Sequence, residues 1–291
     1  MTTHQFTQYQ PPTAANAHAT EIGGRTVQQD AATFRTRSAP GACYLIAAIA
    51  DGLGSAKGSE YVARAAVEAV CALGEAADYG YCPEELLPLA AAVLPLHIPT
   101  AESAAGIAFS GFADGPGYGY RPDTTIAVVT IDDDADINVG WLGDCRVWVE
   151  VTDGRLIQLT DDHNMARIGR PNVVTRTLGK PGEGFQHANW HHAGRPDWWP
   201  VRVLLTTDGV HGAIPARAIH YALTTAPNAQ RAAIWLTRWA VRAAGRDAAD
   251  NATALLFEIA SAESHRIRAA ESAHGRPEDQ AADQAKAPAP F

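Results

Sequence analysis

Four aspartates stand where apolar segments end or where the chain turns sharply, namely Asp30, Asp51, Asp208 and Asp250. The run Leu45–Ala50 leads into Asp51, and the run Val203–Thr207 leads into Asp208. A carboxylate held at the end of a buried strand is partly shielded from water, which costs free energy unless a positive group meets it. Oxygen donors of this kind suit hard divalent cations such as Mg²⁺ and Mn²⁺. The sequence therefore predicts a metal centre built from carboxylates.

Strand patterns dominate the centre of the chain, where two hairpins are expected. An acidic turn over residues 132–136 joins the first pair of strands, and Asp153-Gly154, a strong signal for a short hairpin, joins the second. We read both acidic turns as solvated loops without chemistry. The paired segments are Thr125–Ile131 with Ile137–Trp141, and Val147–Val151 with Arg155–Leu159.

Helical periodicity appears in two long segments, Ser59–Leu73 and Ala229–Ala244, and in a shorter one that opens at Pro83. Strands follow strands, and the helices do not alternate strictly with them. A doubly wound parallel sheet is therefore not favoured. We predict an α+β fold, a four-layer α-β-β-α sandwich in which a central antiparallel β-sandwich is flanked by helices. Trp235 and Trp239 recur at helical spacing and are expected to be core or packing residues.

Composition divides the 291 residues into a core and two tails. Residues 1–18 and 261–291 are poor in apolar residues, so both are expected to be disordered, and residues 19–260 form the predicted domain. The net charge of −9 argues against a nucleic-acid partner, which would need a basic stripe. The four cysteines show no Cys-x-x-Cys pair. No signal peptide or membrane span is recognisable, and a cytoplasmic protein without a membrane partner is expected.

Eight short motifs occur in order along the chain. Each alone is weak, since Asp-Gly is above all a turn dipeptide. As a series over about residues 18–260 they resemble the metal-dependent serine/threonine phosphatases of type 2C, in a bacterial form with a short flap. The motifs are Arg25 with Asp30, Asp51-Gly52, Asp123-Thr124-Thr125, Gly143-Asp144-Cys145-Arg146, Leu159-Thr160-Asp161-Asp162-His163, Thr175-Arg176-Thr177-Leu178-Gly179, Thr207-Asp208-Gly209 and Asp250-Asn251-Ala252-Thr253.

The resemblance implies two ions, Mn²⁺ or Mg²⁺, with a hydroxide between them that attacks the phosphorus of phosphoserine or phosphothreonine. Two ions about 3.5–4 Å apart can lower the pKa of a bound water and hold it in line. By the same resemblance, Asp51 bridges the ions and the Gly52 carbonyl adds a ligand. Asp208 and Asp250 complete the coordination of one ion, and Asp30 supports the other ion through a bound water.

Two further site residues follow from the resemblance. Asp144 corresponds to the acid that helps to hold a third, weaker ion in bacterial members. Arg25 occupies the position of the phosphate clamp, and a guanidinium fork suits a phosphate bidentately. The implied partner is a phosphorylated protein, the product of a serine/threonine kinase.

The chain departs from the family pattern at several positions. Gln29 stands where an acid commonly precedes Asp30, and Leu53 stands where animal members carry a histidine that is thought to protonate the leaving group. The general acid is therefore unassigned. Only 11 residues separate His163 from Thr175, so the flap segment is expected to be short.

Other functions compete with this interpretation. A catalytically weak family member could act as a phosphoprotein-binding or regulatory module, which Gln29 and the short flap favour and the complete acid set disfavours. A nuclease is disfavoured by the acidic balance. An aspartyl-phosphate mechanism lacks its Asp-x-Asp pair. His187, His191 and His192 look zinc-like, but we expect a surface loop there, and we expect a structural hydrogen bond from His163.

Overall fold

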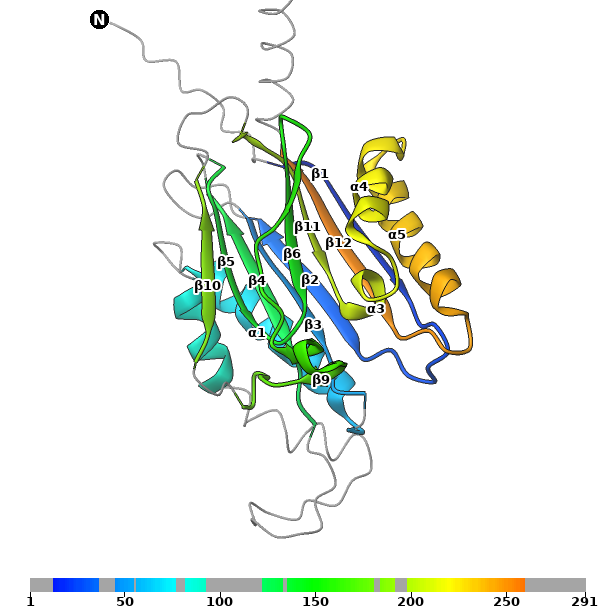
Figure 1. The fold of residues 1–291 in the computed structure, drawn as a ribbon. Helices are drawn as coiled ribbons and strands as arrows, with labels where there is room; N and C mark the ends of the chain where they lie inside the picture. The colour runs from blue at the N-terminus through cyan, green and yellow to red at the C-terminus, as the bar shows by residue number, and fades with distance from the viewer. Residues whose placement is uncertain are drawn as a thin grey trace, which may run out of the picture.

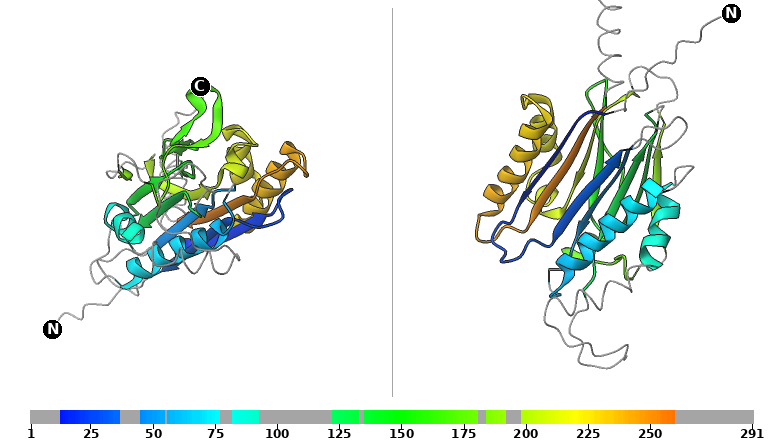
Figure 2. Two further views of the ribbon diagram at one scale, coloured as in Figure 1. Left: turned by 90° about the horizontal axis from the view of Figure 1, so that it is seen from below. Right: turned by 180° about the vertical axis from the view of Figure 1, so that it is seen from behind.

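The computed structural model describes residues 13–36, 45–54, 56–76, 82–92, 122–132, 135–180, 184–191 and 198–259. Two five-stranded antiparallel sheets stack on each other, and helices cover their outer faces (Figure 1). Seen from behind, α1 lies on one sheet and α5 on the other (Figure 2). The predicted α+β, four-layer α-β-β-α sandwich is confirmed.

The first sheet has the strand order β10-β5-β4-β3-β2. Helix α1 (Ser59–Ala76) packs on its outer face, together with a helix described over residues 83–92. The predicted hairpin is confirmed as β4 paired with β5. The strands are β2 (Asp30–Thr36), β3 (Leu45–Asp51), β4 (Ile126–Ile131), β5 (Ile137–Leu142) and β10 (Gln186–Trp190).

The second sheet has the strand order β1-β12-β11-β6-β7. Three helices cover its outer face, namely α3 (Asp208–His211), α4 (Ala216–Thr225) and α5 (Ala229–Ala244). The second predicted hairpin is confirmed as β6 with β7, and Gly154 takes the positive φ of 87° that its turn requires. The strands are β1 (Thr13–Glu21), β6 (Arg146–Val151), β7 (Leu156–Gln158), β11 (Pro200–Thr206) and β12 (Ala252–Ile259).

The main hydrophobic core lies between the two sheets. Alternate residues of β3, β4 and β5 meet alternate residues of β6, β11 and β12 there, and Phe257 and Ile49 are among the fully buried side chains. Two further apolar clusters lie between each sheet and its helices. Strands buried on both faces read as nearly continuous apolar runs. This explains why β3 and β11 are recognisable in the sequence.

The expected N-terminal tail is too long by six residues. Strand β1 begins at Thr13 and pairs with β12 from Thr13↔Ile259 to Glu21↔Ala252, so residues 13–18 belong to the sheet. Backbone hydrogen bonds to an established strand outweigh the weak strand propensity of this segment. Residues 1–12 and 261–291 lie outside the described part of the chain, as does most of the expected connection over residues 95–122. No helix among the described residues is long and apolar enough to cross a membrane.

Candidate active site

The predicted site aspartates lie at one end of the sandwich, because the strands that carry them run in opposite directions. Strand β3 ends at Asp51 and β2 begins at Asp30, and these two residues are partners in the antiparallel register. In the other sheet, β11 ends just before Asp208, and Asp250 lies just before β12. Asp144 lies in the turn from β5 to β6, which joins the two sheets.

The carboxyl groups of Asp30, Asp51, Asp144 and Asp208 are buried, and burial raises their pKa values. Burial raises the pKa of Asp30 to about 7, and the charges of Asp208 and Asp250 act in the same direction. Burial also raises the pKa of Asp51 well above its ordinary value, with the charge of Asp208 next in importance. The pKa of Asp144 is raised to about 7 by burial and by Asp208. A cluster of this kind is stable only when protons or cations offset its negative charge.

Two carboxylate oxygens of this cluster are buried without a hydrogen-bond partner in the described structure, Oδ1 of Asp30 and Oδ1 of Asp208. The other oxygen of Asp30 accepts a 2.9 Å hydrogen bond from the hydroxyl of Thr207. A buried oxygen without a partner costs about 1–3 kcal/mol, more when it is charged. These oxygens are therefore suited to bind a cation.

The donor chemistry fits a hard divalent ion, since every predicted side-chain ligand is a carboxylate. No three His, Cys, Asp or Glu side chains among the described residues surround one point as metal ligands do. Two of the carboxyls are instead held by other groups. Asp51 shares a hydrogen bond with Asp208, and Asp250 Oδ2 lies 2.6 Å from Nη2 of Arg25.

Arg25 lies at the open edge of the carboxylate cluster. Its guanidinium and the Asp250 carboxyl are 43% and 39% exposed, so the pair faces solvent. The same guanidinium lies beside Gly54, where an added Cβ would be 3.0 Å from Nη1. A phosphate that approaches from solvent can therefore reach this side chain.

Two glycines at the site permit close backbone contacts. A Cβ added at Gly52 would lie 2.8 Å from the carbonyl oxygen of Ser59, and one at Gly209 would lie 1.9 Å from that of Asn251. Real Cβ atoms do not come that close to backbone oxygen. The glycines that follow Asp51 and Asp208 are thus required by packing.

Asp123 supports the site without belonging to the carboxylate cluster, a role that sequence reasoning did not assign. Its carboxylate accepts hydrogen bonds of 2.8 Å from the backbone N–H groups of Thr124 and Gly179, and another from the hydroxyl of Thr177. Thr124 in turn donates a 2.9 Å hydrogen bond to the carbonyl of Asp51. The motifs at 123–125 and 175–179 thus hold the end of β3.

Asp123→Asn is expected to destabilise the fold by about 2–4 kcal/mol, because an amide NH₂ would face hydrogen-bond donors that now have an acceptor. Urea unfolding measures the loss. Asp161→Asn is the control, because Asp161 is exposed, and it should change the stability by less than about 0.5 kcal/mol. Equal stability of Asp123→Asn and the wild type would contradict the structural role of Asp123.

Asn251 connects the loop before β2 with Asp250, its own neighbour in the chain. Its Oδ1 accepts from the backbone N–H of Gln29, and its Nδ2 donates to the carbonyl of Ile22, each at 2.9 Å. The Asn251 N–H donates to Oδ1 of Asp250 at 2.8 Å. The Gln29 side chain points elsewhere, toward the carbonyl of Ala56 at 3.4 Å.

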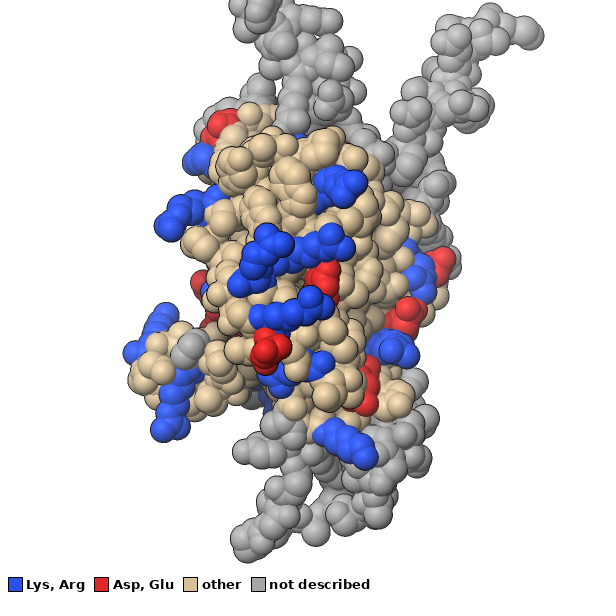
Figure 3. Space-filling model, turned by 90° about the vertical axis from the view of Figure 1, so that its right-hand side faces the viewer, with Lys and Arg blue, Asp and Glu red and all other residues tan. Residues whose placement is uncertain are grey.

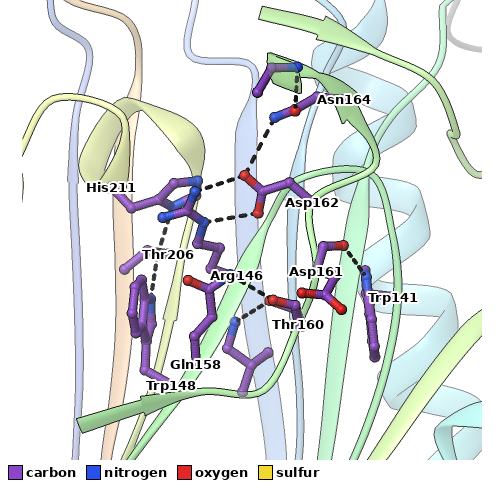
Figure 4. Close-up of polar contacts among 12 residues, drawn as sticks. Trp141, Arg146, Trp148, Gln158, Thr160, Asp161, Asp162, Asn164, Thr206 and His211 are labelled. Atoms are coloured by element: carbon purple, nitrogen blue, oxygen red, sulfur yellow. Dashed lines mark hydrogen bonds and ion pairs between the residues drawn. The ribbon is translucent and has the colours of Figure 1, made fainter. Parts of the chain in front are cut away.

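The turn that carries Asp144 is anchored by a bidentate ion pair that also escaped sequence reasoning. Arg146 donates from Nε and Nη2 to the two oxygens of Asp162, at 2.9 and 2.7 Å (Figure 4). The guanidinium lies over the Trp148 ring, 5.7 Å from its centroid. Buried His211 hydrogen-bonds Thr206 on β11 at 2.9 Å, and burial lowers its pKa well below the ordinary value.

The histidines follow the sequence expectations in part. His163 accepts a 3.1 Å hydrogen bond from the N–H of Gly143, which confirms its structural role. His187 lies in strand β10, so the expected surface loop is wrong at this position, although the side chain is exposed. His191 pairs with Asp136 at 2.7 Å, and His192 lies outside the described residues.

The segment between His163 and Thr175 forms a small hairpin. Strand β8 (Asn164–Met165), a 3₁₀ turn (Ala166–Ile168) and β9 (Arg170–Val174) complete it within the 11 residues. Gly169 ends the turn with a φ of 77°. Ile168 at its tip is 72% exposed.

Comparison with known proteins agrees with this architecture. A family model described as Protein phosphatase 2C matches residues 19–239. The serine/threonine phosphatase Stp1 from Staphylococcus aureus superposes with a TM-score of 0.64 at 15% identity, over 89% of this chain and 99% of that one. The Mycobacterium tuberculosis serine/threonine phosphatase PstP/Ppp gives 0.61 at 18% identity, over 84% and 98%.

PppA, described as a key regulatory component of T6SS in Pseudomonas aeruginosa, gives a TM-score of 0.61 at 19% identity, over 84% of this chain and 97% of that one. No curated protein sequence matches the chain. Identities this low show the fold, and the family model supplies the assignment, because it matches well over half of the chain. The structures similar to this chain include bacterial serine/threonine phosphatases. The chain therefore belongs to the protein phosphatase 2C family.

Proposed function

We propose that the protein is a Mg²⁺- or Mn²⁺-dependent phosphatase that hydrolyses phosphoserine and phosphothreonine in proteins. The observation that carries the proposal is the cluster of buried carboxyls with raised pKa values at one end of the sandwich, two of whose oxygens lack partners in the described structure. Such a cluster costs stability in the free protein. Functional sites are where such costs are concentrated.

The residues that would hold the ions are Asp51, Asp208 and Asp250, with the Gly52 carbonyl, and Asp30 acting through water. Asp144 would hold a weaker third ion beside Asp208. When bound, the ions supply a water activated for attack on phosphorus, which a reaction as slow as phosphate-monoester hydrolysis requires. No serine or cysteine nucleophile paired with a base is needed.

Arg25 would orient the phosphate. Its fork now engages Asp250 at 2.6 Å, in a half-exposed pair of the kind that contributes little to stability and exchanges readily. An incoming dianion could therefore take over one of its donors, while Asp250 turns to an ion.

The proteins with similar structures support the proposed substrate class, since Stp1 and PstP/Ppp are bacterial serine/threonine phosphatases. A phosphoprotein made by a serine/threonine kinase is the proposed substrate, and the cytoplasm is the proposed location. A catalytically weak binding module is not favoured, because a scaffold has no need for a buried acid cluster.

Arg25→Ala is expected to raise KM for a small aryl phosphate about tenfold with a smaller change in kcat, because a charge-assisted contact to the phosphate is lost before and during reaction. Steady-state kinetics with saturating Mn²⁺ measure both constants. Arg25→Lys keeps the positive charge but not the planar guanidinium fork, so its KM should lie between those of the wild type and Arg25→Ala. A fall in kcat with KM unchanged would mean that Arg25 contacts the phosphate only in the transition state.

A panel of phosphopeptides tests the proposed function directly. Phosphate release from phosphoserine and phosphothreonine peptides should require Mn²⁺ or Mg²⁺ and stop in excess EDTA, with slower release from a phosphotyrosine peptide of the same sequence. Metal-dependent binding without release would favour the binding module instead.

A further inference from the structure

Helix α5 carries a stripe of arginines and tryptophans on its outer face. The residues are spaced four, three, one and three positions apart, which places them on one side of an α-helix. The opposite side packs on the second sheet through small residues such as Ala232, Ala233 and Ala240. The stripe consists of Arg231, Trp235, Arg238, Trp239 and Arg242.

This face is basic on an acidic protein. Neither α4 nor α5 contains an Asp or Glu, whereas the whole chain has a net charge of −9. Within the described residues, Arg217, Arg231 and Arg242 are exposed and form no ion pair, while Arg238 binds Glu21 at 3.1 Å. Figure 3 shows Lys and Arg side chains gathered on this side of the molecule. Like charges four residues apart, as in Arg238 and Arg242, disfavour the helix, so solvation alone gives this pattern no advantage.

Three aromatic rings form a continuous stack beside the arginines. Trp235 and Trp239 stack with centroids 5.6 Å apart, and Tyr221 of α4 stacks on Trp239 at 6.1 Å. Tyr221 is 57% exposed, and both tryptophans are half-buried, with Trp239 packed against the apolar cluster between the helices and the second sheet. The rings fix one another in place, so a partner can bind them at a low entropic cost.

The composition of this face is typical of the centre of a protein–protein interface. Trp, Tyr and Arg are enriched there and provide most hot spots, whereas Lys, Glu and Asp are depleted. Both helices carry arginine as their only basic residue besides His220. The unbalanced positive charge selects a partner segment rich in Asp and Glu.

The stripe leads toward the carboxylate cluster. Helix α5 ends at Ala244, and residues 245–249 run directly into Asp250. The backbone of Gly24, next to Arg25, packs on this connection, donating a 2.9 Å hydrogen bond to the carbonyl of Ala249. A chain bound along α5 would therefore approach the site from the side of Arg25.

We propose that the outer face of α4 and α5, defined by Arg217, Tyr221 and the α5 stripe, docks an acidic segment of the phosphoprotein substrate. The proposal rests on the phosphatase function proposed above. It places selection among phosphoproteins on this basic aromatic face, beside a site whose carboxylates would hold only the ions and whose phosphate contact is Arg25.

The test compares Arg231→Glu/Arg242→Glu with a control of equal charge change, Arg64→Glu/Arg155→Glu, placed on α1 and on the β6–β7 turn. All four arginines are exposed, although Arg155 pairs with Asp153 and lies over the Trp198 ring, so far-UV circular dichroism and thermal unfolding check that both variants fold. The substrates are a phosphothreonine peptide with a flanking Glu/Asp/Phe segment, the same peptide with Lys in place of each acid, and a small aryl phosphate. Binding of the unphosphorylated acidic peptide, labelled with fluorescein, is measured by polarisation.

We expect the α5 variant to raise KM for the acidic phosphopeptide about tenfold or more and to weaken polarisation binding equally, because two central charges are reversed. Its turnover of the aryl phosphate, and both activities of the control, should stay unchanged. Unchanged KM and binding in the α5 variant would overturn the docking surface. The docking surface would also be overturned if the wild type bound phosphatidylserine vesicles but not the acidic peptide, and if the α5 variant lost this vesicle binding. Absent aryl phosphate turnover in the wild type would instead overturn the phosphatase function, while polarisation would still report on docking.

Discussion

Asp208→Asn is expected to lower turnover by about 10³-fold or more and, at the same time, to make the metal-free protein more stable at pH 8 by about 1–3 kcal/mol. Asp208 hydrogen-bonds Asp51 and raises the pKa of Asp30, Asp51 and Asp144 through its charge. An amide of the same shape removes that repulsion. It also replaces one carboxylate oxygen by an NH₂ group, which can donate a hydrogen bond to the neighbouring carboxylate of Asp51.

Chemical unfolding in EDTA and aryl phosphate turnover in Mn²⁺ measure the two effects on the same preparation. Asp161→Asn is the matched control, since it replaces an exposed carboxylate and should alter neither quantity. A variant that loses stability along with activity would show that Asp208 is a structural acid. A variant that keeps its activity would remove Asp208 from the site.

Mn²⁺ is expected to stabilise the protein more at pH 8 than at pH 5.5, by about 2–4 kcal/mol. The pKa values of Asp30 and Asp144 are about 7 in the folded chain and near 3.8 when unfolded. The folded metal-free protein therefore holds protons that the unfolded chain has released, and their contribution to stability is complete below about pH 4 and is lost as the pH rises through about 7. At pH 5.5 an ion must displace these protons, and at pH 8 it need not.

Thermal unfolding at both pH values, with Mn²⁺ and with EDTA, provides the comparison. The buried His211 titrates in the opposite sense, because its lowered pKa costs stability as the pH falls. At a given pH, His211 contributes equally with Mn²⁺ and with EDTA, so its contribution cancels when the two stabilities are subtracted. A Mn²⁺ effect that is equal at both pH values would mean that the raised carboxyls do not bind the ion, and Asp208→Asn should reduce the effect throughout.

Central strands such as β3, β4 and β11 could be predicted from the sequence because they are buried on both faces, whereas the edge strands β1 and β10 could not. Strands β1 and β10 each lie at the edge of a sheet, and neither Thr13–Glu21 nor Gln186–Trp190 contains a valine or isoleucine. They form because β12 and β5 offer unpaired backbone groups along the edge. Information of this kind resides in the neighbouring strand and not in the segment itself.

Helix α5 shows the same division between local and tertiary information. Its bounds match the prediction, Ala229–Ala244, because Asn228 caps its first turn by accepting from the Arg231 N–H, and Gly245 follows its end. The helical spacing did not show that Trp235 and Trp239 lie at the margin of the buried face. Alanines pack closest to the sheet, so the large rings are left at the boundary with α4.

The site itself was predictable as a set of acids but not as a network. Asp30 and Asp51 meet because β2 and β3 pair in that register, and the strand ends bring Asp208 and Asp250 to the same place. The supporting contacts from Asp123 to Thr177 and from Asn251 to Gln29 join residues far apart in the chain. Their partners become apparent only when the two sheets are assembled.

Hydrolysis of a small aryl phosphate by the purified protein, in Mn²⁺, in Mg²⁺ and in excess EDTA, tests the central claim most directly. Asp208→Asn, run alongside, controls for contaminating phosphatases. We predict turnover that requires a divalent ion and disappears in the variant. Turnover that persists in EDTA or in Asp208→Asn, or no turnover by the folded protein with either ion, would contradict it.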